Sequence, residues 1–372
     1  MKIVIFCHSL LSDWNHGNAH FLRGIVAELL DRSHEVVSYE PRDGWSRENL
    51  VADGGREALA DVRRAFPWMD AVAREYGSVA TLDLDRALDR ADLVLVHEWN
   101  DPALVRAVGR KRAAGGGFRL LFHDTHHRAV TKPEEMERYD LSGYDGVLAY
   151  GAVLRDVYLE RGWAERAWTW HEAADTRVFR PLAAEPERDL VWVGNWGDDE
   201  RTAELHEFLL RPARQLRLRG AIHGVRYPRR GRWSIRLAGL RYRGWLPNHR
   251  APEAFARHRV TVHVPRGPYV AKLPGIPTIR PFEAMACGIP LVSAPWDDVE
   301  GLFRPGVDHL RAADGAEMKR ALRSILADPE LAAGLRREGL RTITERHTCA
   351  HRVDELLAVA EELGPSPEEV VA

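Results

Sequence analysis

The most informative stretch of this 372-residue chain is Leu273-Pro-Gly-Ile-Pro-Thr-Ile-Arg-Pro-Phe-Glu-Ala-Met-Ala-Cys-Gly-Ile-Pro-Leu-Val-Ser-Ala-Pro-Trp296. Its pattern predicts a Gly/Pro loop, a short helix and a buried strand. Thr278 is expected to cap the helix, and Gly288 fits just past its end. The free N–H groups and the positive dipole end of such a helix form a natural site for a diphosphate. Glu283, one turn into the helix, can accept hydrogen bonds from a ribose diol.

The same residues also allow a purely structural interpretation. Phe282, Met285 and Ala286 then fill a core, and Glu283 only favours the positive end of its helix. From the residues alone the two interpretations are balanced.

Strand-like runs alternate with helical patterns along the chain. A continuous β-rich run, Lys2–Cys7, opens the sequence and is followed by a helical stretch over about 19–32. Further runs lie at 34–39, 91–96, 118–122, 146–149 and 167–170, and then at 189–193, 220–223, 260–264 and 289–293. This alternation predicts βαβ units in two doubly wound α/β domains, divided by a short Pro/Ala/Glu linker at 181–188.

The composition is that of an ordinary globular protein with room for two domains. Hydrophobic residues make up 45% and charged residues 29%, and a net charge of −2 gives no overall bias toward nucleic acid or membranes. The chain has no run of ~18 apolar residues that would span a membrane, and its opening run is too short for a signal peptide. Three cysteines lie far apart, which suggests a reducing compartment. We therefore expect a cytoplasmic protein.

The stretch Arg280-Pro-Phe-Glu-Ala-Met-Ala-Cys-Gly-Ile-Pro-Leu-Val292 resembles the donor-binding segment of GT-B glycosyltransferases of group 1 (family 4-like). The longer run Gly275–Glu283, with Ala294-Pro-Trp296, is similar to the bacterial branch of spore-maturation glycosyltransferases. The resemblance implies two Rossmann-like domains facing a cleft, an acceptor-side domain over 1–182 and a donor domain over 188–347. It also implies that the segment 348–372 is a C-terminal helix that crosses back to the first domain, followed by a frayed tail.

The implied reaction moves a sugar from a nucleoside-diphosphate sugar to an acceptor. Similarity to group 1 enzymes implies retention of the anomeric configuration without a metal or any other cofactor. The acceptor is then a carbohydrate, a lipid, a protein or a small metabolite.

This chain departs from the group 1 pattern at two places. Such enzymes commonly carry an Arg just after the first donor-domain strand and a Lys about six residues later, where this chain has Asn195 and Arg201. They also often carry two Glu residues with seven residues between them, and Gly275 stands in the place of the first. Lys272 or Arg266 could supply the missing charge, because a diphosphate leaving group needs about two cationic partners. A helix-surface ion pair with Asp198 or Glu204 is the structural alternative for Arg201.

The resemblance thus implies a donor site in which the diphosphate meets two cations and backbone N–H groups, while Glu283 binds ribose. Its residues are Asn195, Arg201, Lys272, Gly275, Ile276, Thr278, Ile279 and Glu283.

Two polar segments of the first domain follow buried strands. His97-Glu98 matches a His-Glu pair of the related enzymes, and His123 matches a catalytic His that lies near the reacting sugar. The cluster from His123 to His127, which includes His126 as an acceptor-side candidate, also invites a metal interpretation. Its spacing fits no helical His-x-x-x-His site, so sugar contact is the preferred interpretation.

The loop after the first strand offers further acceptor contacts: Asp13, His16 and Gly17, which permits close approach. His20 is the candidate general base if the enzyme inverts, as a His in this region serves that purpose in inverting GT-B enzymes. An ordinary His at a helix N-terminus explains the same residue equally well.

An arginine-rich stretch lies at 211–250. It holds twelve Arg and no acidic residue between Glu207 and Glu253, with Trp233, Tyr242 and Trp245 interleaved. A solvated face is the usual explanation of such a run, but the imbalance would attract anionic lipid, nucleic acid or an acidic acceptor. Peripheral contact with an anionic membrane is one function open to this stretch, arginines that line the nucleotide cleft are another, and specific nucleic-acid binding is not expected.

Two other functions are open at this point. One is a nucleotide-sugar epimerase of the same fold, which would need carboxylates placed for proton transfer at C2. The other is a non-catalytic sugar- or nucleotide-binding protein, which the departures at Asn195 and Gly275 favour.

Overall fold

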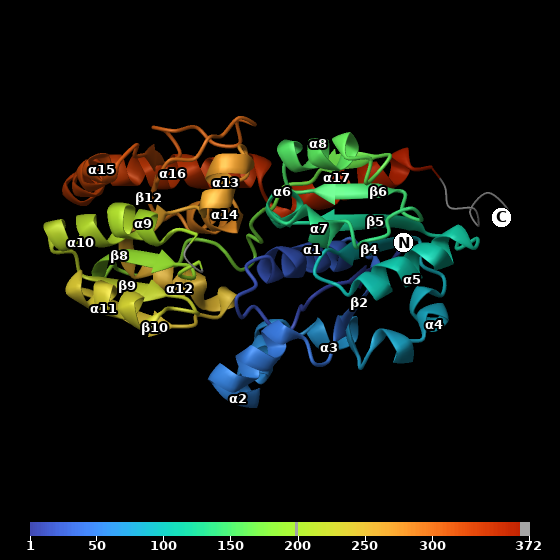
Figure 1. Ribbon diagram of the computed structural model, residues 1–372. Helices are drawn as coiled ribbons and strands as arrows, with labels where there is room; N and C mark the ends of the chain where they lie inside the picture. Colours follow the sequence, from blue (N-terminus) through green and yellow to red (C-terminus); the bar gives the residue numbers. More distant parts are fainter. Residues whose placement is uncertain (198–199, 365–372) are drawn as a thin grey trace. The chain divides into compact units, whose positions relative to one another are not determined.

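The computed structural model describes residues 1–197 and 200–364 and divides the chain into two compact units (Figure 1). Unit 1 consists of Met1–His171 and the returning segment that begins at Cys349, and unit 2 is Glu172–Thr348. The tail that was expected to fray lies outside the described residues from position 365 onward. Within the described ranges no helix has the length and apolarity that a membrane crossing requires.

Unit 1 is a parallel sheet covered by helices. Its described strands are β1 (Lys2–Phe6), β2 (Glu35–Pro41), β3 (Ala73–Tyr76), β4 (Leu93–His97), β5 (Arg119–Asp124), β6 (Gly146–Ala149) and β7 (Ala167–Thr169). Its helices are α1 (Ala19–Asp31), α2 (Trp45–Ala65), α3 (Met69–Val72), η1 (Val79–Thr81), α4 (Leu84–Leu88), α5 (Pro102–Ala113), α6 (Arg128–Thr131), α7 (Pro133–Met136), α8 (Ala152–Glu160) and α17 (Cys349–Glu362). The strand order is β3-β2-β1-β4-β5-β6-β7.

Helix α17 completes unit 1, although it is the last helix of the chain. It packs on α1, where Arg32 Nη1 lies 2.5 Å from Asp354 Oδ1. Trp170, at the end of β7, donates its indole N–H to the carbonyl of Arg352 at 2.8 Å. These contacts confirm that the C-terminal helix crosses back to the first domain.

Unit 2 repeats the plan with a second parallel sheet. Its described strands are β8 (Arg188–Val193), β9 (Gly220–His223), β10 (Leu240–Gly244), β11 (His258–His263), β12 (Leu291–Ser293) and β13 (Leu310–Arg311), in the order β10-β9-β8-β11-β12-β13. Its helices are α9 (Thr202–Leu205), η2 (His206–Leu210), α10 (Arg211–Leu216), α11 (Arg229–Leu237), η3 (Asn248–Arg250), α12 (Ala251–Ala256), α13 (Gly267–Lys272), α14 (Ile279–Ala286), α15 (Gly315–Ala327) and α16 (Pro329–Arg346).

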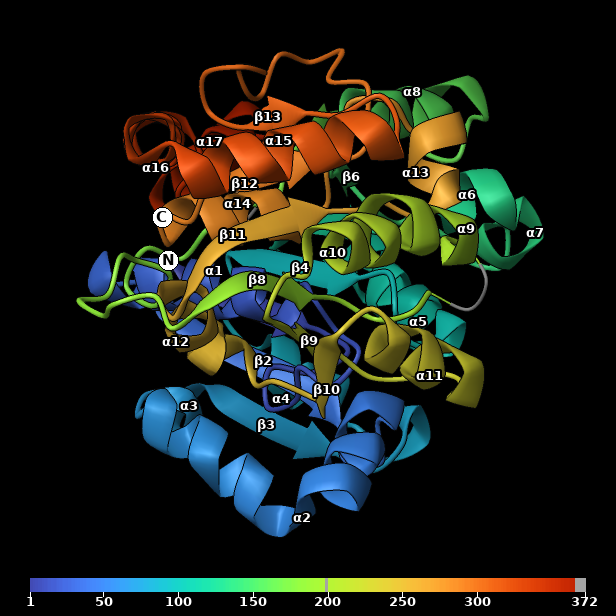
Figure 2. The same cartoon turned by 90° about the vertical axis from the view of Figure 1, so that its left-hand side faces the viewer.

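Both faces of the unit 2 sheet are buried, because successive strand residues point to opposite faces. In β8, Leu190 and Trp192 join one hydrophobic cluster with side chains of α10, α11 and α15. Val191 and Val193 join a second cluster with side chains of α12 and α14. Figure 2 shows these helices alongside the strands. This two-sided burial explains why the strands read as continuous apolar runs.

The strand order reverses once in each sheet, between β1 and β4 in unit 1 and between β8 and β11 in unit 2. Ligands of open α/β sheets bind beyond the carboxyl ends of the strands at such a switch point. The loops that follow these four strands are therefore the places to look for chemistry.

The cap that was predicted at Thr278 is wrong. Thr278 precedes α14, but its side chain makes no capping hydrogen bond. Its φ is 62° and its ψ −178°, whereas a capping residue needs an extended conformation with negative φ to bring its hydroxyl over the first N–H groups. Positive φ is unusual for a β-branched residue and stores strain at this loop.

Candidate functional site

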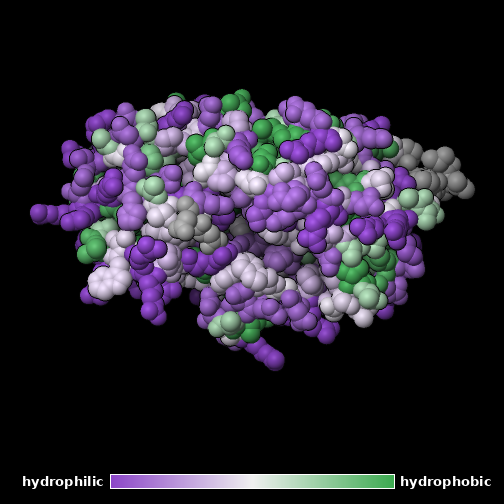
Figure 3. Space-filling view, in the orientation of Figure 1, coloured by the Kyte–Doolittle hydropathy of each residue, from purple (hydrophilic) through white to green (hydrophobic). Residues whose placement is uncertain are grey.

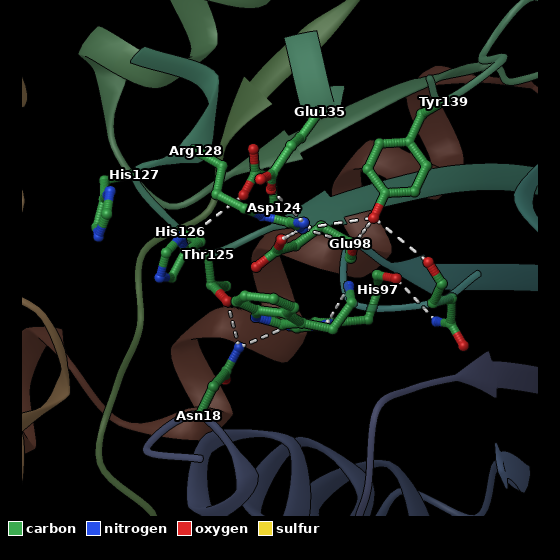
Figure 4. Close-up of polar contacts among 12 residues, drawn as sticks. Asn18, His97, Glu98, Asp124, Thr125, His126, His127, Arg128, Glu135 and Tyr139 are labelled. Atoms are coloured by element: carbon green, nitrogen blue, oxygen red, sulfur yellow. Dashed lines mark hydrogen bonds and ion pairs between the residues drawn. The ribbon is translucent and has the colours of Figure 1, made fainter. Parts of the chain in front are cut away.

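In unit 1 the ends of β4 and β5 bring predicted residues together (Figure 4). His97 closes β4 and pairs in register with His123 of β5, and their ring centroids lie 5.1 Å apart. Asn18, from the loop after β1, places its amide nitrogen 3.0 Å from His97 Nε2 and 2.8 Å from Thr125 Oγ1. Residues of three loops thus converge on His97 at the switch point.

Four imidazoles form a row at this edge. The ring centroids of His8 and His16 are 5.2 Å apart, and those of His16 and His97 are 6.1 Å apart. Burial lowers the pKa of His123 to about 3 and that of His8 to about 4, and it also lowers the pKa values of His16 and His97. The row is therefore neutral at physiological pH. Within the described residues, Nε2 of His16 and Nε2 of His123 are buried and have no hydrogen-bond partner, so each keeps an unused hydrogen-bonding position.

Glu98 is fully buried and forms an ion pair with Arg128. The Arg128 guanidinium also lies 4.0 Å from the ring centroid of Trp99. Burial and the Asp124 carboxylate raise the pKa of Glu98, while Arg128 acts in the opposite direction. Asp124 accepts hydrogen bonds from Tyr158 Oη at 2.8 Å and from the His126 amide at 2.9 Å. The Glu98 and Asp124 carboxylates therefore hold the loops after β4 and β5 in place. The exposed side chain in this region is Trp99, which is 41% exposed and packs edge-on against His126.

The buried Arg23 side chain fixes the loop after β1. Asp13, predicted as an acceptor contact, lies 3.0 Å from Arg23 Nη1, and both side chains are buried. Arg23 Nε donates to the carbonyl of Leu10 at 2.7 Å. His20 lies buried on α1, and Gly17 is partly exposed. Among the residues predicted in this loop, His16 is the one that stands in the imidazole row.

In unit 2, Arg201 spans the switch point. Its guanidinium donates to the carbonyl of Val264 at 2.9 Å, beyond β11, and to the carbonyl of Asn195 at 2.5 Å, beyond β8. Burial, together with Arg266, lowers its pKa to about 9. Arg201 makes no ion pair within the described residues, which include the candidate partner Glu204, whereas the other candidate, Asp198, lies outside them. Asn195 has a different role, because its side-chain oxygen accepts from the Val225 amide at 2.8 Å.

The loop before α14 presents two free backbone donors. The Gly275 amide donates to the carbonyl of Asp297 at 2.7 Å, and the Ile276 amide donates to that of Leu273 at 3.3 Å. The amides of Thr278 and Ile279 make no hydrogen bond within the described part of the chain. These two N–H groups point from the positive end of α14, which is the arrangement that binds phosphate.

Gly275 and Glu283 differ from what the sequence alone suggests. Gly275 has φ 92°, and a Cβ atom there would lie 2.7 Å from Glu300 Oε1, so a carboxylate from another segment occupies the neighbouring space. Glu283 is buried and forms an ion pair with Arg280. Burial, together with the nearby Glu283 carboxylate, raises the pKa of Glu172 to about 8. Lys272 is exposed at the end of α13.

Beside this loop lies a cavity of about 120 Å³ at the end of β12. Its lining comprises Ser293, Trp296, Asp297, Asp298, Phe303, Pro305, His309 and Arg311. Asp297 links it to the loop through the bond to Gly275. Trp296 ends the stretch 273–296, part of which resembles the donor-binding segment of group 1 enzymes. The sequence around His309, in contrast, has no pattern that predicts its place in this cavity. No group of three or more His, Cys, Asp or Glu in the described ranges is placed to hold a metal ion.

Comparisons with known proteins agree with this architecture. Residues 201–358 match a family model described as glycosyl transferase-like. A search of curated protein sequences finds no match. Similar solved structures include sucrose-phosphate synthase from Thermosynechococcus elongatus, with 14% identity, a TM-score of 0.66 and coverage of 98% of this chain and 99% of that one.

Two further similar structures contain UDP. HepE from Anabaena, in complex with UDP and glucose, has 12% identity and a TM-score of 0.64 over 97% of this chain and 100% of that one. A TarM mutant from S. aureus, in complex with fondaparinux, alpha-GlcNAc-glycerol and UDP, has 9% identity and a TM-score of 0.67 over 96% and 99%. Likeness at this level of identity shows the fold, which is the GT-B fold of two Rossmann-like units.

Proposed function

We propose that this protein is a glycosyltransferase that moves a sugar from a nucleoside-diphosphate sugar to an acceptor. The observation that supports it most is in unit 2, where an arginine and two backbone N–H groups that have no anionic partner among the described residues lie in the loops beyond β8 and β11, the strands of the topological switch point. Within residues 1–197 and 200–364, Arg201 and the amides of Thr278 and Ile279 are donors that no carboxylate accepts from. A diphosphate supplies the missing negative charge. The glycosyl transferase-like match covers the same residues.

On the donor side, Arg201 and Lys272 would stabilise the diphosphate together with the backbone between Gly275 and Ile279. Glu283 would bind the ribose diol, and for this a carboxylate oxygen that now pairs with Arg280 must accept hydrogen bonds from the ribose hydroxyls instead. The cavity beside Trp296 would accept hydroxyl groups of the donor sugar. Because HepE and TarM were crystallised with UDP, UDP-sugars are the first donors to test.

On the acceptor side, the imidazole row of unit 1 would contact sugar hydroxyls, with His123 as the residue nearest the reacting carbon. Neutral imidazoles suit this task, because each offers one donor and one acceptor to a hydroxyl group. His16, His97 and His126 would then line the acceptor region. Glu98 and Asp13 would act through the loops that they hold.

The proposed reaction proceeds with retention and without a metal. The bond between the anomeric carbon and the phosphate oxygen breaks, and a bond from that carbon to the acceptor oxygen forms on the same face. The acceptor proton passes to the departing phosphate oxygen, whose developing charge Arg201 stabilises. In the inverting alternative a protein base takes that proton, and His20 is the candidate.

Within the GT-B proteins we place the chain beside the spore-maturation branch, on the residues quoted above. We also propose a cytoplasmic location, which the three buried cysteines support, since none forms a disulfide within the described residues and such thiols persist in a reducing compartment. The acceptor would be a carbohydrate or a carbohydrate-bearing lipid or protein.

A non-catalytic nucleotide-binding role is the main competing function, and the pairing of Glu283 with Arg280 favours it. An epimerase of the same fold is the other. Donor hydrolysis without an acceptor, followed by analysis of the sugar product, separates all three, because an epimerase releases an altered sugar and a binding protein releases none.

The first test is calorimetric titration of UDP, dTDP, GDP and ADP against the full chain and its Arg201→Gln variant. Loss of a charged hydrogen bond costs about 1.5–3 kcal/mol, so the variant should bind the preferred nucleotide roughly 10- to 150-fold more weakly. Arg336→Gln, at an exposed arginine of α16, is the matched control and should bind as the wild type does. If none of the four nucleotides binds, the transferase proposal fails.

A further inference from the structure

Helix α11 carries a surface that the proposed reaction does not use. This surface, called the α11 surface below, consists of the exposed residues Arg229, Arg230, Arg232, Trp233, Arg236 and Leu237. The opposite side of the helix is fixed in the fold. Ile235 joins the core of unit 2, and a Cβ atom at Gly231 would lie 2.9 Å from the Trp196 ring. The orientation of α11 is therefore determined by packing.

Two large apolar side chains stand at the centre of the α11 surface. Trp233 is 64% exposed and Leu237 is 67% exposed. They lie four residues apart, so they are neighbours one turn apart on the same face of the helix. At 100° per residue, Arg230 falls on one side of this pair, and Arg229, Arg232 and Arg236 fall on the other. Figure 3 shows green and pale side chains beside purple ones in the region of α11.

Most of the positive charge of the surrounding stretch has no ion-pair partner among the described residues. All twelve arginines between Glu207 and Glu253 are exposed. Arg219 lies 3.9 Å from Asp189. Nine of the twelve make no ion pair with any described residue: Arg211, Arg214, Arg217, Arg229, Arg230, Arg232, Arg236, Arg241 and Arg243. A surface with this much uncompensated charge attracts an anionic partner.

A groove of about 360 Å³ runs beside the helix, between α11 and β10. It is lined by Arg232, Ile235, Arg236, Leu240, Arg241, Tyr242 and Arg243. Four guanidinium groups around a partly apolar groove suit a phosphate that carries an apolar tail.

The apolar pair decides between the anionic partners. Nucleic acid or an acidic glycan would satisfy the arginines, but it would leave Leu237 in water. A bilayer with anionic lipids satisfies both, because Trp and Leu enter the boundary between headgroups and acyl chains while Arg pairs with phosphates. We propose that the α11 surface docks this protein on an anionic lipid bilayer, with Trp233 and Leu237 inserted and the flanking arginines on lipid phosphates.

The test is flotation of the full chain with vesicles of phosphatidylcholine alone and with vesicles that also contain phosphatidylglycerol. The wild type should float with the anionic vesicles and stay behind with the neutral ones. Each basic residue near an anionic surface changes the partition coefficient by roughly fivefold. Arg229→Gln with Arg230→Gln should therefore reduce it by roughly 25-fold, and added salt should do the same.

Trp233→Ser with Leu237→Ser keeps every arginine and should reduce binding at least tenfold. Leu159→Ser, at a leucine of α8 that is 41% exposed, is the matched control and should bind as the wild type does. Because all these side chains are exposed, thermal unfolding should be unchanged, and the measurement is independent of nucleotide binding and of activity. Equal binding to neutral and anionic vesicles would overturn the proposal. Unchanged binding of the Trp233→Ser, Leu237→Ser variant to the anionic vesicles would also overturn it. In that case, duplex DNA that binds this variant as well as it binds the wild type would identify nucleic acid as the partner.

Discussion

Replacement of His123 by Gln should make unit 1 less sensitive to acid. His123 is 2% exposed, and burial lowers its pKa in the folded protein from 6.5 to about 3. A histidine whose folded pKa is depressed contributes its full stability above pH 6.5. That contribution is lost as the pH falls from 6.5 toward 3, because over this range His123 is protonated in the unfolded chain but stays neutral in the folded protein.

The size of the effect follows from these two values. Between pH 7.5 and pH 5.0, the unfolded state gains about one proton at this position and the folded state gains almost none. The wild type should therefore lose about 2 kcal/mol through His123 over this interval, at 1.36 kcal/mol per pH unit below 6.5. In a domain the size of unit 1 this corresponds to about 4–8 °C in Tm.

The assay is thermal unfolding of the full chain at both pH values, for the wild type and for His123→Gln. Lost packing against Trp170, whose ring centroid lies 4.8 Å away, lowers the Tm of the variant equally at both pH values and cancels in the difference. The variant should lose less Tm on acidification, by about 4–8 °C in the unit 1 transition. An identical loss in the two proteins would show that His123 titrates normally in the folded state, and the neutral imidazole row would be wrong.

Two further substitutions test the packing of the two candidate regions. Arg128→Met leaves the buried Glu98 without its cation and should destabilise unit 1 by about 3–5 kcal/mol in urea unfolding at pH 8. Adding Glu98→Gln should restore most of this loss, and a double variant no more stable than the single one would contradict the ion pair. Gly275→Ala should cost about 1 kcal/mol for its positive φ, and more because the new Cβ meets Glu300. Gly306→Ala has a φ of 84° with nothing within 4 Å, so equal losses of Tm at the two glycines would refute the contact with Glu300.

Much of the fold could be predicted from the sequence, because the strands are buried on both faces and read as continuous apolar runs. β1, β4 and β8 are of this kind. The strands that the pattern did not indicate lie at the edges of the two sheets. β3 and β10 carry charged residues between their apolar ones, and β13 has two residues, too few for any pattern.

The candidate site was predictable in position but less so in contacts. The rule that ligands bind beyond the carboxyl ends of strands singles out His97 and His123, which lie at the ends of β4 and β5, and Arg201, which lies in the segment after β8. It could not show which polar groups are already satisfied. The pairing of Glu283 with Arg280 is an i, i+3 contact that a helical pattern permits but does not require. The pairing of Glu98 with Arg128 joins residues thirty positions apart, and only the folded chain brings them together.

The edge strand β10 gives the arginines a second consequence. An open sheet edge offers unpaired N–H and C=O groups to any passing strand, and charged side chains are one way in which proteins block such pairing. In β10, Arg241 and Arg243 are both exposed, and at the other edge β13 is only two residues long. Neither edge of unit 2 is a good template for a second chain. The arginine-rich stretch that contains the α11 surface therefore also opposes aggregation through Arg241 and Arg243, and a variant that lacks these two charges for crystallisation or expression would lose that protection.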